Sequence, residues 1–169
     1  MKLFKRKGGE FTIAKPTDAD IEQCAEMVTK AMGQQHISKE VMEKTLQTPG
    51  IVILVAKLKE RIVGMITGIA FPSTIPPPRI DFLNVSDVES AKKGLYSILI
   101  DEFIEELKKR IPTVKYVDTN VSALNLQFMA MYSLKGFTVI GFTRGDTPLS
   151  DIVVLRKPLS NEKAMGYTA

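Results

Sequence analysis

The hydrophobic and polar positions of this chain follow two periods, one typical of strands and one typical of helices. Alternating or β-branched runs predict strands at about residues 11–15, 51–58, 61–71, 79–85, 114–121, 138–144 and 151–157. Apolar residues at helical spacing predict helices at about residues 18–32, 38–48, 95–110 and 125–136. This order of strands and helices indicates a mixed α/β domain.

Prolines and polar residues mark the connections between these elements. The segment Pro72–Pro78 contains four prolines, so it is expected to be a stiff loop and not a linker between domains. A polar stretch from Ser86 to Lys93 interrupts the strand pattern before the long helix. Lys108, Lys109 and Arg110 suit the negative end of that helix, and Pro112 confirms its end.

Length and composition predict one globular domain. The chain has 169 residues, of which 44% are hydrophobic, and single domains commonly have about 100–150 residues. We expect a basic N-terminal tail at residues 1–10, the domain at residues 11–158 and a flexible C-terminal tail at residues 159–169. No apolar run reaches the ~20 residues that span a bilayer, and the first residues lack the apolar region of a secretory signal. The sequence therefore predicts a cytoplasmic protein without a membrane partner.

Charge and the rare residues narrow the possible chemistry. The net charge is +4, and Lys2, Lys5, Arg6 and Lys7 supply four positive charges, which leaves 0 for the rest of the chain. A broad nucleic-acid-binding face is therefore disfavoured. Because the chain has one Cys and one His, an internal disulfide is excluded, and a zinc or redox motif and a histidine-dependent catalytic triad find no support. No metal site is expected.

The helix at residues 125–136 carries the most specific motif. Asn125, Phe128 and Tyr132 stand three and four residues apart, so they share one face. Gly136 follows Tyr132 by four residues and is placed to end the helix with a positive φ, and Phe137 then starts the next strand. An amphipathic helix packed on a sheet, with Tyr132 half-buried, is the simpler interpretation of the same residues.

This motif resembles the last conserved helix of the GNAT (GCN5-related N-acetyltransferase) family, and the order of elements over residues 11–158 is similar to that family's order. The resemblance implies a single-domain α/β fold with a mixed, mainly antiparallel sheet of about six to seven strands and about four flanking helices. It also implies acetyl-CoA as cosubstrate, without a metal, and direct attack of a primary amine on the acetyl group. The acceptor, a small-molecule or peptide amine, is not identified by the sequence.

The resemblance extends in part to the family's phosphate-binding loop, which corresponds here to residues 91–99. Gly94 matches the first glycine, whereas Ala91 stands where Gln or Arg is usual and Tyr96 where a second small residue is usual. Backbone N–H groups at a helix N-terminus bind anions through unpaired donors and the helix dipole. The cofactor-binding residues that the resemblance implies are Leu83, Asn84, Val85, Lys92, Lys93, Gly94, Leu95, Tyr96, Ser97, Asn125, Phe128 and Tyr132.

The resemblance further implies Tyr132 as the acid that protonates the leaving thiolate, and a backbone N–H near residues 83–85 as the donor to the thioester carbonyl. Asp81 is the candidate base, and a partner for Arg79 is its alternative role. The acceptor site is expected around residues 26–36 and 71–78.

Two other functions stay open on the sequence. A non-catalytic acyl-CoA-binding module with the same fold is favoured by the altered loop residues Ala91 and Tyr96. A nucleic-acid partner would use the basic N-terminus and would show a salt-dependent affinity. Both a monomer and a homodimer are compatible with the sequence.

Overall fold

The structure, a computed structural model, describes residues 2–6, 9–33, 36–71, 77–147 and 150–159. The strands are β1 Lys2–Arg6, β2 Gly9–Ala14, β3 Ile51–Leu58, β4 Arg61–Ile69, β5 Arg79–Val85, β6 Tyr116–Ser122, β7 Thr138–Thr143 and β8 Ile152–Pro158. The α-helices are α1 Ile21–Met32, α2 Lys39–Gln47, α3 Val88–Lys92, α4 Leu95–Arg110 and α5 Leu126–Leu134, and a 3-10 turn at Asp18–Asp20 leads into α1.

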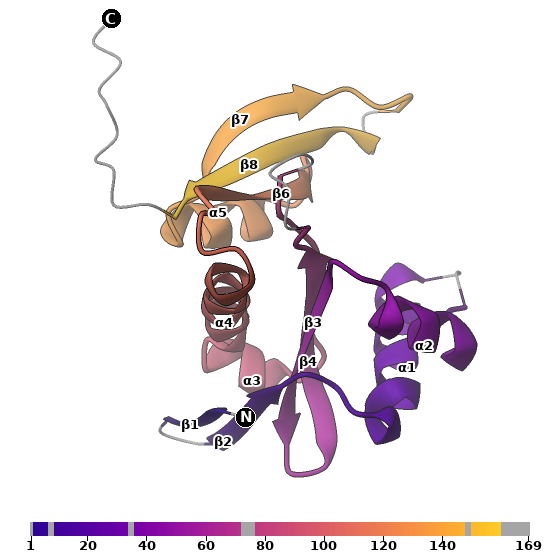
Figure 1. Cartoon of the computed structure of the whole chain (residues 1–169). Coiled ribbons are helices and arrows are strands. Elements are labelled where there is room, and N and C mark those ends of the chain that lie inside the picture. The colour runs from indigo at the N-terminus through magenta and orange to yellow at the C-terminus, as the bar shows by residue number, and fades with distance from the viewer. Residues whose placement is uncertain (1, 7–8, 34–35, 72–76, 148–149, 160–169) are drawn as a thin grey trace, which may run out of the picture.

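One mixed sheet organises the molecule (Figure 1). Its strand order is β1-β2-β3-β4-β5-β6-β8-β7. β5 and β6 pair in parallel, and every other neighbouring pair is antiparallel. Helices α1 and α2 cover one face of the central strands, and α3 and α4 cover the opposite face. The sheet is therefore mainly antiparallel, as expected, and in the described part of the chain it has eight strands where about six to seven were expected.

Two hydrophobic clusters hold the helices to the sheet. The larger one joins α4, including the fully buried Leu99 and Phe103, to strands β2 to β6 and β8 and to Tyr132 of α5. The smaller one packs Met27 of α1 and Met42 of α2 on the other face of β3 and β4. Because both faces of β3 and β4 are covered, these strands are nearly continuous hydrophobic runs in the sequence.

The structure differs from the sequence-based expectations at the N-terminus. Residues 1–10 were expected to be a solvated tail, but β1 pairs antiparallel with β2 from Lys2↔Ile13 to Arg6↔Gly9. The basic residues Lys2, Lys5 and Arg6 led to the prediction of a tail, although charged residues are also common in edge strands. The expected C-terminal tail, residues 159–169, lies outside the described residues apart from Leu159.

A short helix was also missed. The polar stretch after β5 was expected to be a loop, and it contains α3. Asp87 caps this helix, because its side chain accepts a hydrogen bond of 2.8 Å from the Ser90 N–H, and the Ser90 side chain is buried. The cap compensates for the lack of an apolar period in so short a helix.

A β-bulge shapes the strand that leads to the candidate site. Thr67 of β4 registers with Phe82 of β5, and Gly68 registers with Ile80, so Asp81 is the extra residue. A Cβ atom on Gly68 would lie 2.0 Å from the Arg79 carbonyl oxygen and 2.6 Å from Phe103 Cζ. Glycine at position 68 therefore allows the close approach of β4 to β5 at the bulge.

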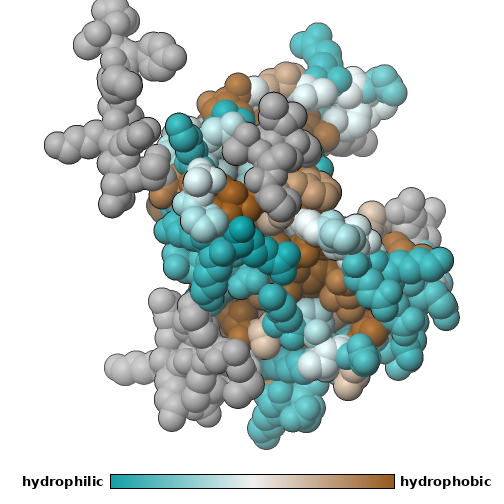
Figure 2. Space-filling model, viewed as in Figure 1, coloured by the Kyte–Doolittle hydropathy of each residue, from teal (hydrophilic) through white to brown (hydrophobic). Residues whose placement is uncertain are grey.

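Figure 2 shows apolar surface in the middle of this face and in separate patches at the end formed by α5, β7 and β8. The exposed large apolar side chains of α5 and β7 are Leu126, Leu134, Val139, Ile140 and Phe142. None of the helices in the described part of the chain is long and apolar enough to cross a membrane.

Candidate active site

The candidate site lies where β5 and β6 separate. The two parallel strands register at Arg79↔Asp118 and Ile80↔Thr119, and no further pair joins them among the described residues. Beyond Ile80, β5 stays paired with β4, and beyond Thr119, β6 stays paired with β8. The strands thus open like a V, and the edge of β5 that faces β6 offers backbone donors and acceptors to a ligand.

Tyr132 of α5 stands at the closed end of this V. Its side chain is almost fully buried, with 2% exposed, and its ring contacts Phe137 at a centroid distance of 4.9 Å. Thr119, which belongs to the last β5–β6 pair, is near enough to influence the Tyr132 phenol. Burial raises the pKa of Tyr132 to about 12, against a smaller lowering by the Thr119 hydroxyl. The phenol is therefore a protonated donor at neutral pH.

The ends of α5 explain two residues of its motif. The Asn125 side chain accepts a hydrogen bond of 3.1 Å from the Phe128 N–H, so Asn125 is the N-cap of α5. Gly136 has a φ of 82°, and the Phe137 N–H donates to the Tyr132 carbonyl at 3.0 Å. The spacing of Asn125, Tyr132 and Gly136 thus fixes the length of α5, and this places the Tyr132 ring at the V.

The N-terminus of α4 has the unpaired backbone N–H groups expected of an anion site, but fewer of them than the loop residues could supply. Gly94 takes a φ of 80° as the N-cap. The N–H groups of Leu95, Tyr96 and Ser97 belong to the first turn, where intrahelical acceptors are lacking. The Lys93 N–H donates to Glu89 O at 3.1 Å and the Gly94 N–H to Ala91 O at 2.9 Å. Of the five backbone N–H groups at residues 93–97, two therefore already donate within α3 and its C-terminus.

The Tyr96 side chain is half-buried and contacts an aromatic ring of α5. Its ring meets the Phe128 ring edge to face, at a centroid distance of 5.5 Å, and both side chains are half-buried. Tyr96 stands in the first turn of α4 and Phe128 in the first turn of α5. The two rings therefore connect the N-terminal turns of the two helices that border the V.

The predicted residues on β5 divide between its two faces. Leu83 and Val85 are buried against the α4 side of the sheet, in the larger cluster. Asn84 points the other way, toward α1. Their backbone atoms share the strand, but only Leu83 and Val85 have side chains on the face that holds α4 and Tyr132.

Two of the charged residues expected in the site, Asp81 and Lys92, form ion pairs with neighbouring side chains. Asp81, at the bulge, binds Arg79 with an Nε–Oδ1 distance of 2.5 Å, which is the alternative role considered from the sequence. An acceptor oxygen of the candidate base is thus occupied by a guanidinium. Lys92 pairs with Glu89 at 3.0 Å on the exposed side of α3, so this lysine brings little free positive charge to the loop.

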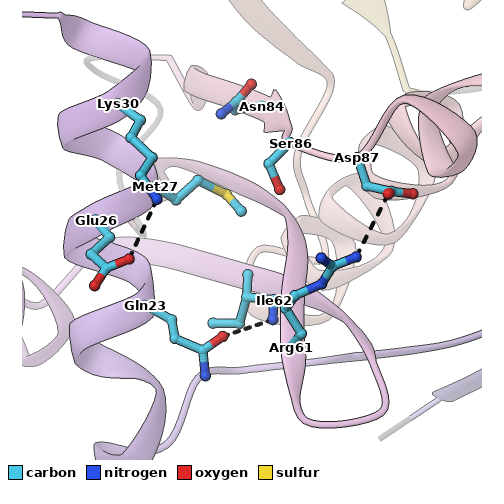
Figure 3. Close-up of a pocket in the computed structure, with 9 residues that line it drawn as sticks. All are labelled: Gln23, Glu26, Met27, Lys30, Arg61, Ile62, Asn84, Ser86 and Asp87. Carbon is cyan, nitrogen blue, oxygen red and sulfur yellow. Dashed lines mark hydrogen bonds and ion pairs between the residues drawn. The ribbon is translucent and has the colours of Figure 1, made fainter.

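A polar pocket of about 250 Å³ lies on the α1 side of β5 (Figure 3). Gln23 and Met27 of α1 form one wall, and Asn84 and Ser86 form the other. The charged groups at its edge form ion pairs, Lys30 with Glu26 at 3.5 Å and Arg61 with Asp87 at 3.6 Å. Gln23 is fixed because its side chain accepts a hydrogen bond of 2.9 Å from the Ile62 N–H.

The expected acceptor region is described only in part. A second hollow, of about 440 Å³, shares Glu26 and Lys30 with the pocket of Figure 3 and reaches His36 and Ser38 at the start of α2. Residues 34–35 and 72–76 of the expected region lie outside the described residues. No group of three or more His, Cys, Asp or Glu side chains that could hold a metal ion occurs in the described part of the chain.

Sequence reasoning missed Thr119. It lies between Val117 and Val121 on the face of β6 that packs into the larger cluster, and it is 2% exposed. A polar residue on the apolar face of a strand was the available signal. Asp118, on the other face, was also missed; it accepts bonds of 2.7 and 2.8 Å from Arg156 of β8.

Solved structures share this fold. A ribosomal-protein-alanine N-acetyltransferase from Brucella melitensis is 20% identical, with a TM-score of 0.73, over 88% of this chain and 99% of that one. An aminoglycoside 6′-acetyltransferase is 15% identical, with a TM-score of 0.72, over 87% and 96%. The PaiA N-acetyltransferase of Thermoplasma acidophilum in complex with coenzyme A is 19% identical, with a TM-score of 0.67, over 88% and 98%.

Sequence comparison gives no comparable match: no protein-family profile matches the chain, and no curated protein is significantly similar to it. The structural likeness defines the class of fold, an α/β acyltransferase fold with a splayed parallel strand pair. More particularly, the chain has the GNAT fold, as the resemblance of its last helix predicted.

Proposed function

We propose that this protein is an N-acetyltransferase that transfers an acetyl group from acetyl-CoA to a primary amine. The observation that carries the proposal is the position of Tyr132, a buried proton donor, at the point where β5 and β6 separate. A coenzyme A complex among the structures with this fold supports the same kind of ligand. Acetyl-CoA would supply an activated acetyl thioester.

The chain offers a fitting group for each part of such a ligand. The first turn of α4 provides the N–H groups of Leu95, Tyr96 and Ser97 for the pyrophosphate. The free edge of β5, at residues 81–85, would pair with the amides of the pantetheine arm. An N–H of this edge would donate to the thioester carbonyl, and Tyr132 would protonate the departing sulfur.

The amine acceptor would enter from the α1 side of β5. The pocket of Figure 3 lies there, next to the strand that would hold the acetyl group, and Asn84 and Ser86 offer it polar atoms. Asp81 is a weak candidate for the base because Arg79 occupies it, so we infer that solvent water accepts the amine proton. Neighbours with this fold are named for protein and aminoglycoside acceptors, and both classes belong in a substrate screen.

A second candidate, a non-catalytic acyl-CoA-binding module, is favoured by one observation. The Tyr96 and Phe128 rings connect the helix ends between which the ligand would pass. The ring contact is worth about 0.5–1.5 kcal/mol, so it slows or weakens ligand entry without forbidding it. The presence of a donor at Tyr132 favours the enzyme.

Calorimetric titration of the protein with acetyl-CoA and with coenzyme A, at moderate salt to screen non-specific attraction, tests the proposal. Saturable one-to-one binding should be followed by release of free thiol when a peptide with a free N-terminus, a polyamine or an aminoglycoside is added. Binding without thiol release from any of these amines would favour the non-catalytic module. Absence of binding at about millimolar ligand, an affinity weaker than about −4 kcal/mol, would exclude both.

A further inference from the structure

The sheet ends in two edge strands that differ in charge. The five residues of β1 include Lys2, Lys5 and Arg6, and charged residues are a common protection of an edge strand against pairing with another chain. The six residues of β7 include no charged residue and no proline. Among the described residues, no strand pairs with the outer edge of β7. β7 therefore offers unpaired backbone N–H and C=O groups without the usual protection.

The apolar side chains of β7 are exposed on a face that is buried in the neighbouring strand. Val139 registers with Leu155 of β8, and Phe142 registers with Val153. Both β8 residues are buried in the larger cluster, which also contains Tyr132 of α5. Registered side chains share a face, so Val139 and Phe142 point to the α5 side, where they are 65% and 55% exposed. Such a pair on an unprotected edge indicates a surface that another chain covers.

Helix α5 adds to this apolar surface. Seven of its nine residues are apolar and lie on all sides of the helix, and a helix of this kind is usually buried. Only Tyr132 of α5 is buried, however, and Leu126 and Leu134 are largely exposed. Figure 1 shows α5 under the strand pair of β7 and β8. Two consecutive elements thus expose apolar side chains at this end of the molecule.

The sequence of β7, Thr-Val-Ile-Gly-Phe-Thr, complements itself around a twofold axis. Two edge strands joined by an axis perpendicular to the sheet run antiparallel and present the same patch to each other. The register that places Val139 opposite Phe142 of the second copy also places Thr138 opposite Thr143. Aromatic–β-branched pairs and Thr–Thr pairs are both favourable across strands. Ile140, the extra residue of the β7 bulge, lies beside the axis in this register.

We propose that β7 is the interface of a homodimer, in which the β7 strands of two copies pair antiparallel around a twofold axis and join their sheets into one. The pairing gives about one backbone hydrogen bond per paired residue and covers Val139 and Phe142 of both copies. The joined sheet ends in the charged strand β1 at both edges, so assembly stops at two copies. The inference does not depend on the proposed acetyl transfer, because it rests on the charge, exposure and register of β7.

Sedimentation velocity of the full chain over a concentration series tests the association. The unmodified protein should have the mass of two chains. Phe142→Lys places a charge on the edge and should raise the dissociation constant of the dimer at least about tenfold. Val41→Lys, a change of an exposed apolar residue of α2, is the control and should remain a dimer. The mass of one chain for the unmodified protein, or an unchanged dissociation constant in Phe142→Lys, would overturn the inference.

The register is tested by cysteine cross-linking, which does not depend on the Phe142→Lys variant. Thr138→Cys and Thr143→Cys lie about 17 Å apart along one strand, but next to each other between two copies in the proposed register. A short thiol-reactive cross-linker should therefore join two chains in the double variant and in neither single variant, as non-reducing electrophoresis would show. The natural Cys24 is buried. Equal cross-linking of the double and single variants, or none in any, would contradict this pairing of β7.

The segment 160–169, which lies outside the described residues, is the other occupant to test. A chain that ends at Leu159 should form the same dimer with the same dissociation constant as the full chain. If the full chain had the mass of one chain and the shortened chain the mass of two, the C-terminal segment would cover β7, and the inference would fail.

Discussion

The ring of Tyr96 meets the ring of Phe128 edge to face, with 5.5 Å between the centroids. This contact joins the first turns of α4 and α5 across the region where the pyrophosphate and pantetheine would lie. This contact allows two alternatives that experiment can separate. Either the rings block the entry of the ligand, or one ring moves and packs against the bound ligand.

We expect Tyr96→Ala to bind coenzyme A more tightly. Removal of the ring contact, worth about 0.5–1.5 kcal/mol, should strengthen binding about 2- to 12-fold. Tyr96→Phe retains the ring and should bind like the unmodified protein. Calorimetry measures both, and weaker binding of Tyr96→Ala would show that the Tyr96 ring contacts the ligand.

Ser97→Asp should weaken coenzyme A binding at least about tenfold, because a carboxylate in the first turn of α4 would repel the pyrophosphate. The same change should leave the thermal stability equal or slightly higher, since an acidic residue suits a helix N-terminus by about 0.3–1 kcal/mol. Ser97→Asn is the uncharged control. These two variants avoid the backbone strain that a substitution of Gly94 would add, because the φ of 80° at Gly94 is unfavourable for any other residue. Equal affinities of the two variants would place the pyrophosphate elsewhere.

Tyr132→Phe should lower turnover about 10²- to 10⁴-fold and leave cofactor affinity nearly unchanged, because it removes only the transferable proton. Turnover by time-resolved thiol release and affinity by calorimetry give the two values. A parallel loss of affinity would mean that Tyr132 has a structural role instead.

The same residue should make the fold sensitive to strong alkali. The pKa of Tyr132 rises from 10.0 to about 12 on folding because of burial. Stability is therefore fully present below pH 10 and is lost as the pH rises toward 12, where the unfolded chain releases a proton that the folded chain keeps. The share of the loss that belongs to Tyr132 should reach about 3 kcal/mol, or two pKa units, and Tyr132→Phe should lack this share and keep only the part due to the buried Cys24 thiol, whose pKa also rises to about 12. Urea titrations of both proteins across this range measure the difference.

A buried ion pair beside α1 predicts how the stability of the fold changes at acid pH. Asp20, with 3% of its surface exposed, binds Lys57 at 2.6 Å and accepts hydrogen bonds from Thr17. Burial alone would raise the pKa of Asp20, but the bonds from Lys57 and Thr17 lower it below its ordinary 3.8. The stabilisation is therefore present above the ordinary pKa and is lost as the pH falls through the lowered one.

Lys57→Met should destabilise the fold by about 3 kcal/mol at neutral pH, because it leaves a buried carboxylate without its cation. The cost should shrink at acid pH, where Asp20 is protonated. Lys30→Met, which breaks the exposed pair with Glu26, is the control and should cost less than about 1 kcal/mol. Equal costs of the two changes in urea unfolding would contradict this account of Asp20.

Local sequence patterns predicted the elements whose hydrophobic period is strong. The expected strand at 79–85 and helix at 95–110 match β5 and α4, and Ser38 caps α2 as expected, with its side chain accepting from the Val41 N–H. The positive φ of Gly136 was also predicted from its place after α5. These features depend on residues that are close together in the sequence, so the local sequence pattern is enough to predict them.

Features that depend on distant residues were not predictable in the same way. β1 has a charged sequence and exists as a strand because β2 pairs with it. The Asp81 bulge requires Gly68, from another strand, and the buried Thr119 hydroxyl donates to the carbonyl of Ile80, which is 39 residues away in the chain. Family resemblance placed Tyr132 and the α4 N-terminus near a common site, but it gave no sign that the Tyr96 ring would reach Phe128.

The short parallel ladder of β5 and β6 has a consequence for how occupancy can be observed. In a strand, successive amides point to opposite edges, so alternate amides of β5 beyond Ile80 face the gap and not β4. Their hydrogens should exchange quickly with deuterated water in the free protein and slowly once a bound arm accepts their hydrogen bonds. Amide exchange along β5 would then report both the presence and the register of a ligand, residue by residue, without any acetyl transfer having taken place.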